Sequence, residues 1–285
     1  MVKFAFSRRM ALHSMLQTCA VMAASTAASS LLASEGAVTR SVALGAPKFN
    51  NDGTPAYWPG NTIICHIDRR SATFAALLDI HAALMRSGLT HRLAVLPPAS
   101  YHMTVFEGIA FAQRNNYYPS DLPLDASEEA CNQAMLEKLR AFDLGSKLPF
   151  RMRPLTLAEQ TNASAIWLAP SDAQEERKLR GLRDRLADTL KMKAPNHDSY
   201  RFHITLNYLI EKMDQAETAR FAALRRTLLA DFIARSPVVE LRHPEFTFFD
   251  DMFAFRPQLL LDSGGGKLPV VAYSEACSTI PLPNL

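Results

Sequence analysis

The sequence has few cysteines and lacks the short motifs of several enzyme classes. It holds four cysteines and no Cys-x-x-Cys pair, so no thiolate metal site is expected. Buried free thiols are the favoured interpretation of Cys65, Cys131 and Cys277. There is no glycine-rich phosphate loop or dinucleotide fingerprint. The His-x-His and His-Glu-x-x-His patterns are also missing, which disfavours a hydrolase that uses a histidine-bound metal.

Acidic side chains are missing from the first 34 residues. Lys3, Arg8 and Arg9 precede a run made mostly of Ala, Leu, Met, Val and Ser, which is the order found in secretory signals. The segment Ser7–Leu12 also resembles a twin-arginine export motif. We therefore expect residues 1–34 to be an export signal and the mature protein to be periplasmic or secreted. An uncleaved anchor and a cytoplasmic protein with a basic arm are the alternatives.

The rest of the chain lacks a net charge. The formal charge of the whole chain is +3, and residues 1–34 contribute three positive charges, which leaves the remaining residues formally neutral. No apolar stretch in this part is long enough to span a membrane. The composition therefore indicates neither an extended nucleic-acid surface nor a stable membrane span in the mature chain.

The spacing of apolar residues predicts an α+β protein. Strands are expected in short runs rich in β-branched and aromatic residues, and helices where apolar residues recur every three or four positions. The expected strands are 62–67, 93–96, 101–106, 150–157, 165–169, 202–210, 238–241, 245–249 and 253–261. The expected helices are those capped by Ser71 and by Ser171 and those over 127–142 and about 214–234. The order strand, helix, strand, strand occurs in both halves and favours α+β over a doubly wound sheet.

Two segments of these expected strands share one pattern. Each has an aromatic residue, His, an apolar residue, Thr and an apolar residue, and they contain His102 with Thr104 and His203 with Thr205. Side chains two residues apart on a strand point to the same face, so each His shares a face with its Thr. The apolar residues between them then point into the core. One such motif in each half is what an internal duplication would leave.

This set of side chains suits phosphoester chemistry. An imidazole has an unperturbed pKa of about 6.5, so it can gain or lose a proton near neutrality. One His can take a proton from the attacking water or hydroxyl while the other donates a proton to the leaving oxygen. The threonine hydroxyls can donate hydrogen bonds to phosphate oxygens. This mechanism requires neither a metal nor a cofactor, and we expect neither.

The paired His-x-Thr motifs resemble those of the 2H phosphoesterase superfamily, which includes RNA ligase/cyclic phosphodiesterase enzymes. The resemblance covers about residues 60–260. It implies catalytic roles for His102, Thr104, His203 and Thr205. It also implies hydrolysis of a cyclic phosphodiester, such as a 2′,3′-cyclic nucleotide, or of a related ester, with a small phosphorylated or nucleotide substrate as the partner.

The resemblance further implies two pseudo-symmetric lobes around a central cleft, each an antiparallel sheet with helices on the outside. We expect residues 61–262 to form this bilobal domain, with lobes over roughly 61–145 and 146–262. Residues 35–60 are interpreted as a loop that leads into the fold, and residues 263–285 as a loose tail.

Other residues could contact the substrate. Arg201 lies two residues before His203 and nominally on the same strand face, so it is a candidate phosphate contact. Tyr117 and Tyr118 lie in a polar, aromatic loop and could stack on a base. His66 lies in an expected strand, where it could line the cleft or serve the structure alone.

Structural roles are expected for several further side chains. His81 lies on the apolar face of its helix. Tyr208 follows His203 by five residues and would face the other way unless a bulge intervenes. Expected surface residues are His91, His197 and His243, and expected packing residues are Trp58 and Trp167.

Two alternatives to the enzyme are open. A protein of the same fold could bind a nucleotide or phosphorylated metabolite without turnover, although both motifs are intact. A hydrolase could instead hold a metal through His66, His102 and His203. Activity that survives a strong chelator would separate the metal-free enzyme from this last alternative.

Overall fold

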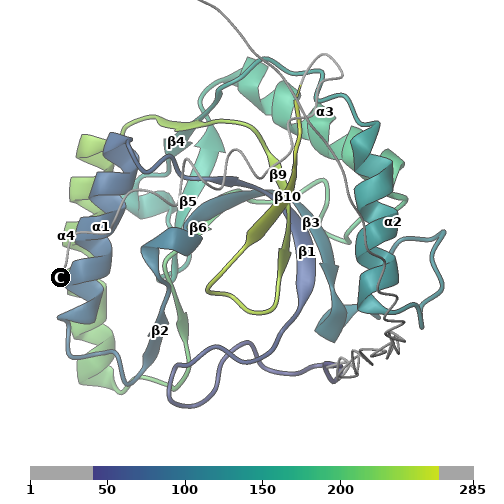
Figure 1. Ribbon diagram of the computed structural model, residues 1–285. Helices are drawn as coiled ribbons and strands as arrows, with labels where there is room; N and C mark the ends of the chain where they lie inside the picture. The colour runs from purple at the N-terminus through teal and green to yellow at the C-terminus, as the bar shows by residue number, and fades with distance from the viewer. Residues whose placement is uncertain (1–40, 263–285) are drawn as a thin grey trace, which may run out of the picture. The chain divides into compact units, whose positions relative to one another are not determined.

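The structure is a computed structural model that describes residues 41–262 (Figure 1). The expected export signal over 1–34 and the expected tail over 263–285 lie outside these residues. Within the described part, no helix has both the length and the apolar character needed to cross a membrane.

An antiparallel sheet of eight strands forms the centre of the fold, in the order β10-β9-β1-β3-β6-β5-β4-β8. Its strands are β1 (Gly60–His66), β3 (His102–Ala110), β4 (Phe150–Pro154), β5 (Ala165–Pro170), β6 (His203–Thr205), β8 (Val239–Leu241), β9 (Glu245–Phe249) and β10 (Arg256–Leu260). A separate two-stranded sheet pairs β2 (Leu93–Val95) with β7 (Asn207–Leu209). The expected strand over 202–210 is therefore divided between two sheets.

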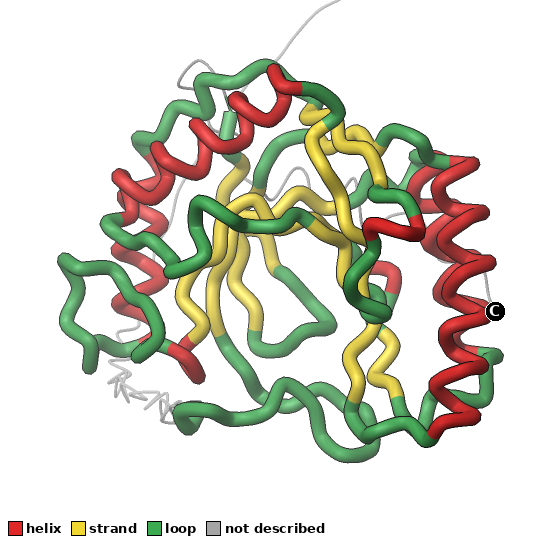
Figure 2. The backbone as a smooth tube through the Cα atoms, turned by 180° about the vertical axis from the view of Figure 1, so that it is seen from behind, coloured by secondary structure: helices red, strands yellow, loops and turns green. Residues whose placement is uncertain are grey.

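The α-helices of the described part flank these strands in two pairs. They are α1 (Ala72–Met85), α2 (Glu128–Arg140), α3 (Ala173–Leu190) and α4 (Gln215–Arg235). Helix α1 packs on α4, and α2 packs on α3. The view from behind shows the strands between the two pairs (Figure 2). The expected α+β fold is confirmed.

Capping side chains set where the helices begin. Ser71 accepts a hydrogen bond from the backbone N–H of Phe74 at the start of α1, as expected. Helix α3 is capped by Asp172 and not by Ser171. The Asp172 carboxylate accepts hydrogen bonds from two backbone N–H groups of the first turn, so it satisfies more of the exposed donors than the neighbouring hydroxyl could.

The two halves of the large sheet are nested in the sequence. The half β6-β5-β4-β8 comes from one continuous stretch of chain, residues 150–241. The half β10-β9-β1-β3 combines strands from both ends of the described chain, because β9 pairs along β1 with Gly60 opposite Phe249. The expected lobe boundary near residue 145 remains a prediction. Strands from both sides of this position build the half β10-β9-β1-β3.

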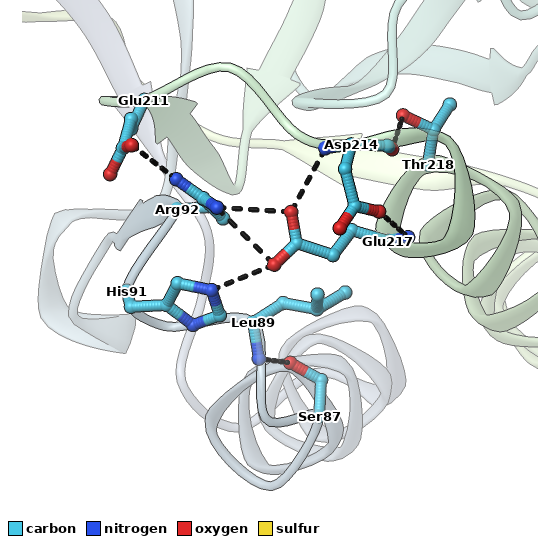
Figure 3. Close-up of polar contacts among 8 residues, drawn as sticks. All are labelled: Ser87, Leu89, His91, Arg92, Glu211, Asp214, Glu217 and Thr218. Atoms are coloured by element: carbon cyan, nitrogen blue, oxygen red, sulfur yellow. Dashed lines mark hydrogen bonds and ion pairs between the residues drawn. The ribbon is translucent and has the colours of Figure 1, made fainter.

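A buried carboxylate ties the turn after α1 to the start of α4 (Figure 3). Glu217 binds His91 Nε2 at 2.8 Å and Arg92 Nε at 3.0 Å, and it accepts a hydrogen bond from the backbone N–H of Asp214. The Asp214 hydrogen bond, followed by those from His91 and Arg92, lowers the pKa of Glu217 to about 2. Arg92 also pairs with Glu211. The network fixes the two segments that connect to the β2–β7 pair.

Candidate active site

The two His-x-Thr motifs lie side by side where β3 meets β6. Met103 is opposite Ile204 in the register of these strands, and both side chains are fully buried. In an antiparallel pair this register places each His beside the Thr of the other motif, with the two imidazoles on a diagonal. All four motif side chains line one pocket of about 400 Å³. The structure thus brings together the four residues that the sequence singles out.

Each imidazole is held in the same way by its own strand. His102 Nδ1 lies 2.6 Å from the carbonyl oxygen of Ser100, and His203 Nδ1 lies 3.0 Å from that of Arg201. A carbonyl oxygen can only accept a hydrogen bond, so Nδ1 carries the proton in both rings. The Nε2 atom of each neutral ring is left without a proton, and it is the atom available to a ligand.

The surroundings of the two rings favour their neutral forms. Burial lowers the pKa of His102 to about 3, helped by the positive charges that His66 and His203 would carry. Burial also lowers the pKa of His203, but the hydrogen bond to the Arg201 carbonyl and then the Glu107 carboxylate oppose this shift. A bound phosphate anion would favour the protonated form of either ring. His203, beside Glu107, is the easier of the two to protonate.

Aromatic rings hold both imidazoles from the side. The ring centroid of Phe255 lies 4.3 Å from that of His102, and the centroid of Trp167 lies 4.8 Å from that of His203. Phe255 comes from the turn between β9 and β10, whereas Trp167 lies on β5 opposite His203. Trp167 therefore packs as expected, and the residue that it packs against is a motif histidine.

A strand irregularity after each motif brings a further side chain into the pocket. In β3, Ile63 pairs with Phe106 and Ile64 with Thr104, so Val105 is an extra residue. Glu107, five residues after His102, thereby comes to line the pocket.

The second motif shows the same arrangement. The backbone N–H groups of Leu206 and Asn207 both donate to the carbonyl oxygen of Ser164. This bulge between β6 and β7 turns Tyr208, five residues after His203, into the pocket. The sequence analysis allowed for a bulge that would turn Tyr208 towards the site. It did not identify Glu107 as a residue of the pocket.

Gly108 allows β1 to approach β3 next to Glu107. A Cβ atom at this position would lie 2.2 Å from the carbonyl oxygen of Asn61, which no side chain could tolerate. The Asn61 side chain instead accepts a hydrogen bond from the backbone N–H of Ile109 at 2.9 Å. The close approach fixes the strand segment that carries Glu107.

A lysine from the leading loop supplies a positive charge to the pocket. Lys48 Nζ lies 4.5 Å from the ring centroid of Trp58 and 5.1 Å from that of Tyr208. It donates a hydrogen bond of 3.5 Å to the Tyr208 hydroxyl. Its charge lowers the pKa of both His102 and His203. Sequence reasoning missed Lys48, because a single lysine in a loop rich in Gly, Pro and Asn carries no spacing signal.

Comparison with known proteins agrees with this geometry. A family model described as 2H-phosphodiest, a domain of unknown function (DUF1868), matches residues 48–163, which include the first motif. The crystal structure of the conserved protein of unknown function ATU0111 from Agrobacterium tumefaciens str. C58 has 30% sequence identity and a TM-score of 0.68. The comparison covers 75% of this chain and 90% of that one. The chain belongs to the 2H phosphodiesterase family.

Its function is therefore of the phosphoesterase type. The structure of Usb1 from Kluyveromyces marxianus also matches, at 12% sequence identity and a TM-score of 0.34, over 70% of this chain and 98% of that one. No curated protein matches this 2H phosphodiesterase.

Of the four predicted substrate-binding residues of this 2H phosphodiesterase, only Tyr117 is among the residues that line the pocket. Its hydroxyl donates to the carbonyl oxygen of Gly108 at 2.7 Å. The Tyr118 hydroxyl instead contacts Cys131 Sγ at 2.7 Å, away from the pocket.

Arg201 and His66 lie outside the pocket lining as well. The Arg201 guanidinium lies over the ring of Trp167, 4.5 Å from its centroid, and donates to the Thr161 hydroxyl. His66 Nδ1 pairs with Glu245 at 2.7 Å. The ring centroid of His66 lies 6.3 Å from that of His102, so His66 lies next to a motif histidine although it does not line the pocket.

Other sequence-based assignments of this 2H phosphodiesterase have mixed outcomes. Cys65 and Cys131 are buried free thiols, as expected, whereas Cys277 lies outside the described residues. His197, expected at the surface, is buried, because it packs near Phe106 and pairs with Asp184 at 2.9 Å. Among the described residues, His197 forms a group of possible metal ligands with Asp184 and Asp198, and these three do not line the pocket.

Proposed function

We propose that this protein is a metal-independent hydrolase of a cyclic phosphodiester, such as a 2′,3′-cyclic nucleotide. The observation that carries the proposal is the pair of imidazoles, each anchored through Nδ1 and facing one pocket. Diagonal neighbours on adjacent strands are about 7–8 Å apart, which leaves room for one phosphoryl group between the two Nε2 atoms.

The electrostatic surroundings suggest which imidazole takes which role. His102 is kept neutral, so its Nε2 takes a proton from water while the water oxygen bonds to phosphorus. Protonated His203, beside Glu107, gives its Nε2 proton to the leaving oxygen as the phosphorus–oxygen bond breaks. The product of a cyclic ester is a phosphomonoester with a free hydroxyl. Proton exchange with solvent then restores neutral His102 and protonated His203.

Hydroxyl and ammonium groups around the imidazoles suit the phosphate. Thr104 and Thr205 can each donate a hydrogen bond to a non-bridging oxygen, on which negative charge develops. Lys48 brings a positive charge that two aromatic rings hold in place. A phosphate placed here also offsets the mutual repulsion of Lys48 and a protonated His203.

The test is a substrate screen of the mature protein with and without a strong chelator. The panel contains 2′,3′-cyclic nucleotides, ADP-ribose cyclic phosphate and 2′-5′ oligonucleotides. We expect turnover of a cyclic phosphate at an unchanged rate with the chelator, and losses of about 10²-fold or more for His102→Ala and His203→Ala. His243→Ala, outside the pocket, is the matched control. Binding of these ligands without turnover would favour the non-catalytic alternative, and loss of activity with the chelator would favour a metal hydrolase.

We also propose that the protein is exported by the signal over residues 1–34. The support is the twin arginine followed by an acid-free apolar run. N-terminal sequencing of the native protein should give a start after about residue 24. A native start at Met1 in the cytoplasm would refute the proposal.

A further inference from the structure

Side chains of opposite charge line the pocket. Among the described residues of the lining, Lys48 carries a positive charge and Glu107 a negative one, and the proposed reaction adds one proton to the pair His102 and His203. Together these groups carry a single net positive charge. A cyclic phosphodiester carries one negative charge, so the charge of the pocket matches that of the proposed substrate.

Hydrolysis changes the charge of the ligand. A phosphodiester has one ionised oxygen, whereas the phosphomonoester product has a second oxygen that ionises with a pKa of about 6. Well above this pH the product therefore carries nearly two negative charges, and the pocket balances only one of them. The additional charge lies in the same pocket as the Glu107 carboxylate, and like charges in a partly buried site repel each other.

Arg183 holds this carboxylate in place. Its side chain is only 1% exposed, and its guanidinium donates to Glu107 Oε2 at 3.0 Å and to the carbonyl oxygen of Val105 at 2.6 Å. The buried guanidinium needs a counter-charge, which Glu107 supplies. Glu107 lines the pocket and Arg183 does not, so the negative end of this ion pair faces a ligand.

The effect of Glu107 on His203 indicates that this negative charge acts inside the pocket. Burial lowers the pKa of His203, and the hydrogen bond to the Arg201 carbonyl and then the Glu107 charge oppose this shift. The charges of Lys48 and Arg201 act in the same direction as burial. Because Glu107 stabilises a positive charge on the His203 ring, it destabilises a negative charge placed against that ring.

We propose that Glu107 promotes product release, because its carboxylate makes the pocket favour a singly charged phosphodiester over a doubly charged phosphomonoester. This inference rests on the proposed function, since it takes the phosphoryl group to lie between the two imidazoles. The carboxylate then acts in each turnover without taking part in proton transfer. The substrate binds as a monoanion, and the product is repelled once it has become a dianion. A neutral residue in place of Glu107 should leave the product bound more tightly.

Binding of two ligands of the same shape tests the proposal without turnover. Adenosine 3′-sulfate carries one negative charge, whereas 3′-AMP carries nearly two at about pH 8. The measured quantity is the ratio of their affinities for the full-length protein. In Glu107→Gln this ratio should move in favour of 3′-AMP by about tenfold or more, because the second charge is no longer repelled. Added salt should reduce the difference between the variant and the wild type.

Kinetics provide a second measurement. With 2′,3′-cyclic AMP as the substrate, inhibition by the monoester product should strengthen by about tenfold in Glu107→Gln. Release of the product should then become slow, so kcat should fall and a burst of product should appear in the first turnover. A change that only disturbed the fold would lower the rate without producing a burst.

Further variants separate the charge of Glu107 from its place in the fold. Glu107→Gln leaves the guanidinium of Arg183 without a counter-charge, so the double variant Glu107→Gln/Arg183→Met, which removes the buried pair together, is the second test. It should show the same shift towards 3′-AMP. Glu107→Asp keeps the charge and should keep the wild-type ratio. Glu137→Gln, at an exposed position of α2, should behave as the wild type.

The outcomes distinguish this inference from the proposed function. If the wild type hydrolyses a cyclic phosphate but the ratio is the same in Glu107→Gln and in the double variant, the role of Glu107 is overturned and the proposed function stands. A Glu107→Asp variant that behaves as Glu107→Gln would likewise exclude an effect of charge. Failure of the wild type to bind either ligand or to hydrolyse any cyclic phosphate would contradict both.

Discussion

Phe255 lies edge-on against His102, with the ring centroids 4.3 Å apart. The two residues are far apart in the sequence and meet because β9 and β10 return to the half of the sheet that contains β1 and β3. The phenyl ring excludes water from one side of the imidazole. It therefore contributes to the burial that lowers the pKa of His102 to about 3.

Phe255→Ala should move the acid limb of the pH–rate profile. A base with a lowered pKa is neutral and active down to acidic pH. Exposing His102 to water should raise its pKa towards about 6.5, so kcat/KM should fall between pH 7 and pH 5 more steeply than in the wild type. Phe253→Ala is the control, because Phe253 packs on Phe49 in the same region. An acid limb that stays in place would show that Phe255 does not set this pKa.

Removing the hydroxyls of Thr104 and Thr205 should lower kcat less than removing the imidazoles of His102 and His203. Thr104→Val and Thr205→Val keep the shape of the side chain and delete one hydrogen bond each, so we expect losses of about tenfold in kcat. The double variant of His102 and His203 should lose much less than the product of the single losses, because the two rings act as a unit. Steady-state kinetics on one substrate would check both. Multiplicative losses at the two histidines would contradict a shared mechanism.

Lys48→Met should weaken substrate binding without abolishing the chemistry. The charge that it removes acts on the phosphate in the ground state and the transition state alike, so KM should rise by about tenfold or more while kcat changes less. Lys48→Arg should recover part of the loss, and Lys193→Met, which removes an exposed lysine paired with Asp198, should have no effect. A fall in kcat alone would place Lys48 in proton transfer instead.

The Glu217 network should make stability depend on pH. Its pKa is lowered in the folded protein, so the stabilisation is present above about 4.5, the value of an unfolded glutamate, and is lost as the pH falls towards about 2. Glu217→Gln should lower the Tm at pH 7, and the difference from the wild type should shrink in acid. Glu211→Gln, at the exposed partner of Arg92, should change the Tm little. A difference in Tm that is independent of pH would refute the assignment.

The sequence predicted the parts of the site that follow from strand periodicity. The four motif residues alternate with buried apolar residues, and side chains two residues apart share a face of any regular strand. Their meeting depends on the Met103–Ile204 register, which no local pattern encodes.

The residues that the sequence missed or misplaced depend on local irregularities and on distant contacts. Glu107 and Tyr208 reach the pocket through bulges, and a bulge reverses the faces that periodicity assigns. Arg201 shares the nominal strand face of His203, but its long side chain packs over the ring of Trp167 and does not line the pocket. Tyr118 is likewise held by Cys131, a contact between a loop and a helix that the order of residues does not reveal.

The nested order of the strands has a consequence for synthesis on the ribosome. The half of the sheet that holds His203 uses residues 150–241 alone, so all its strands are present once that stretch has emerged. The half that holds His102 must wait for β9, because Gly60 pairs with Phe249. Contacts so distant in sequence close slowly, and until then β1 offers an open edge to other chains. A chain that stops before residue 245 carries both His-x-Thr motifs but lacks the strands that complete the sheet around the first.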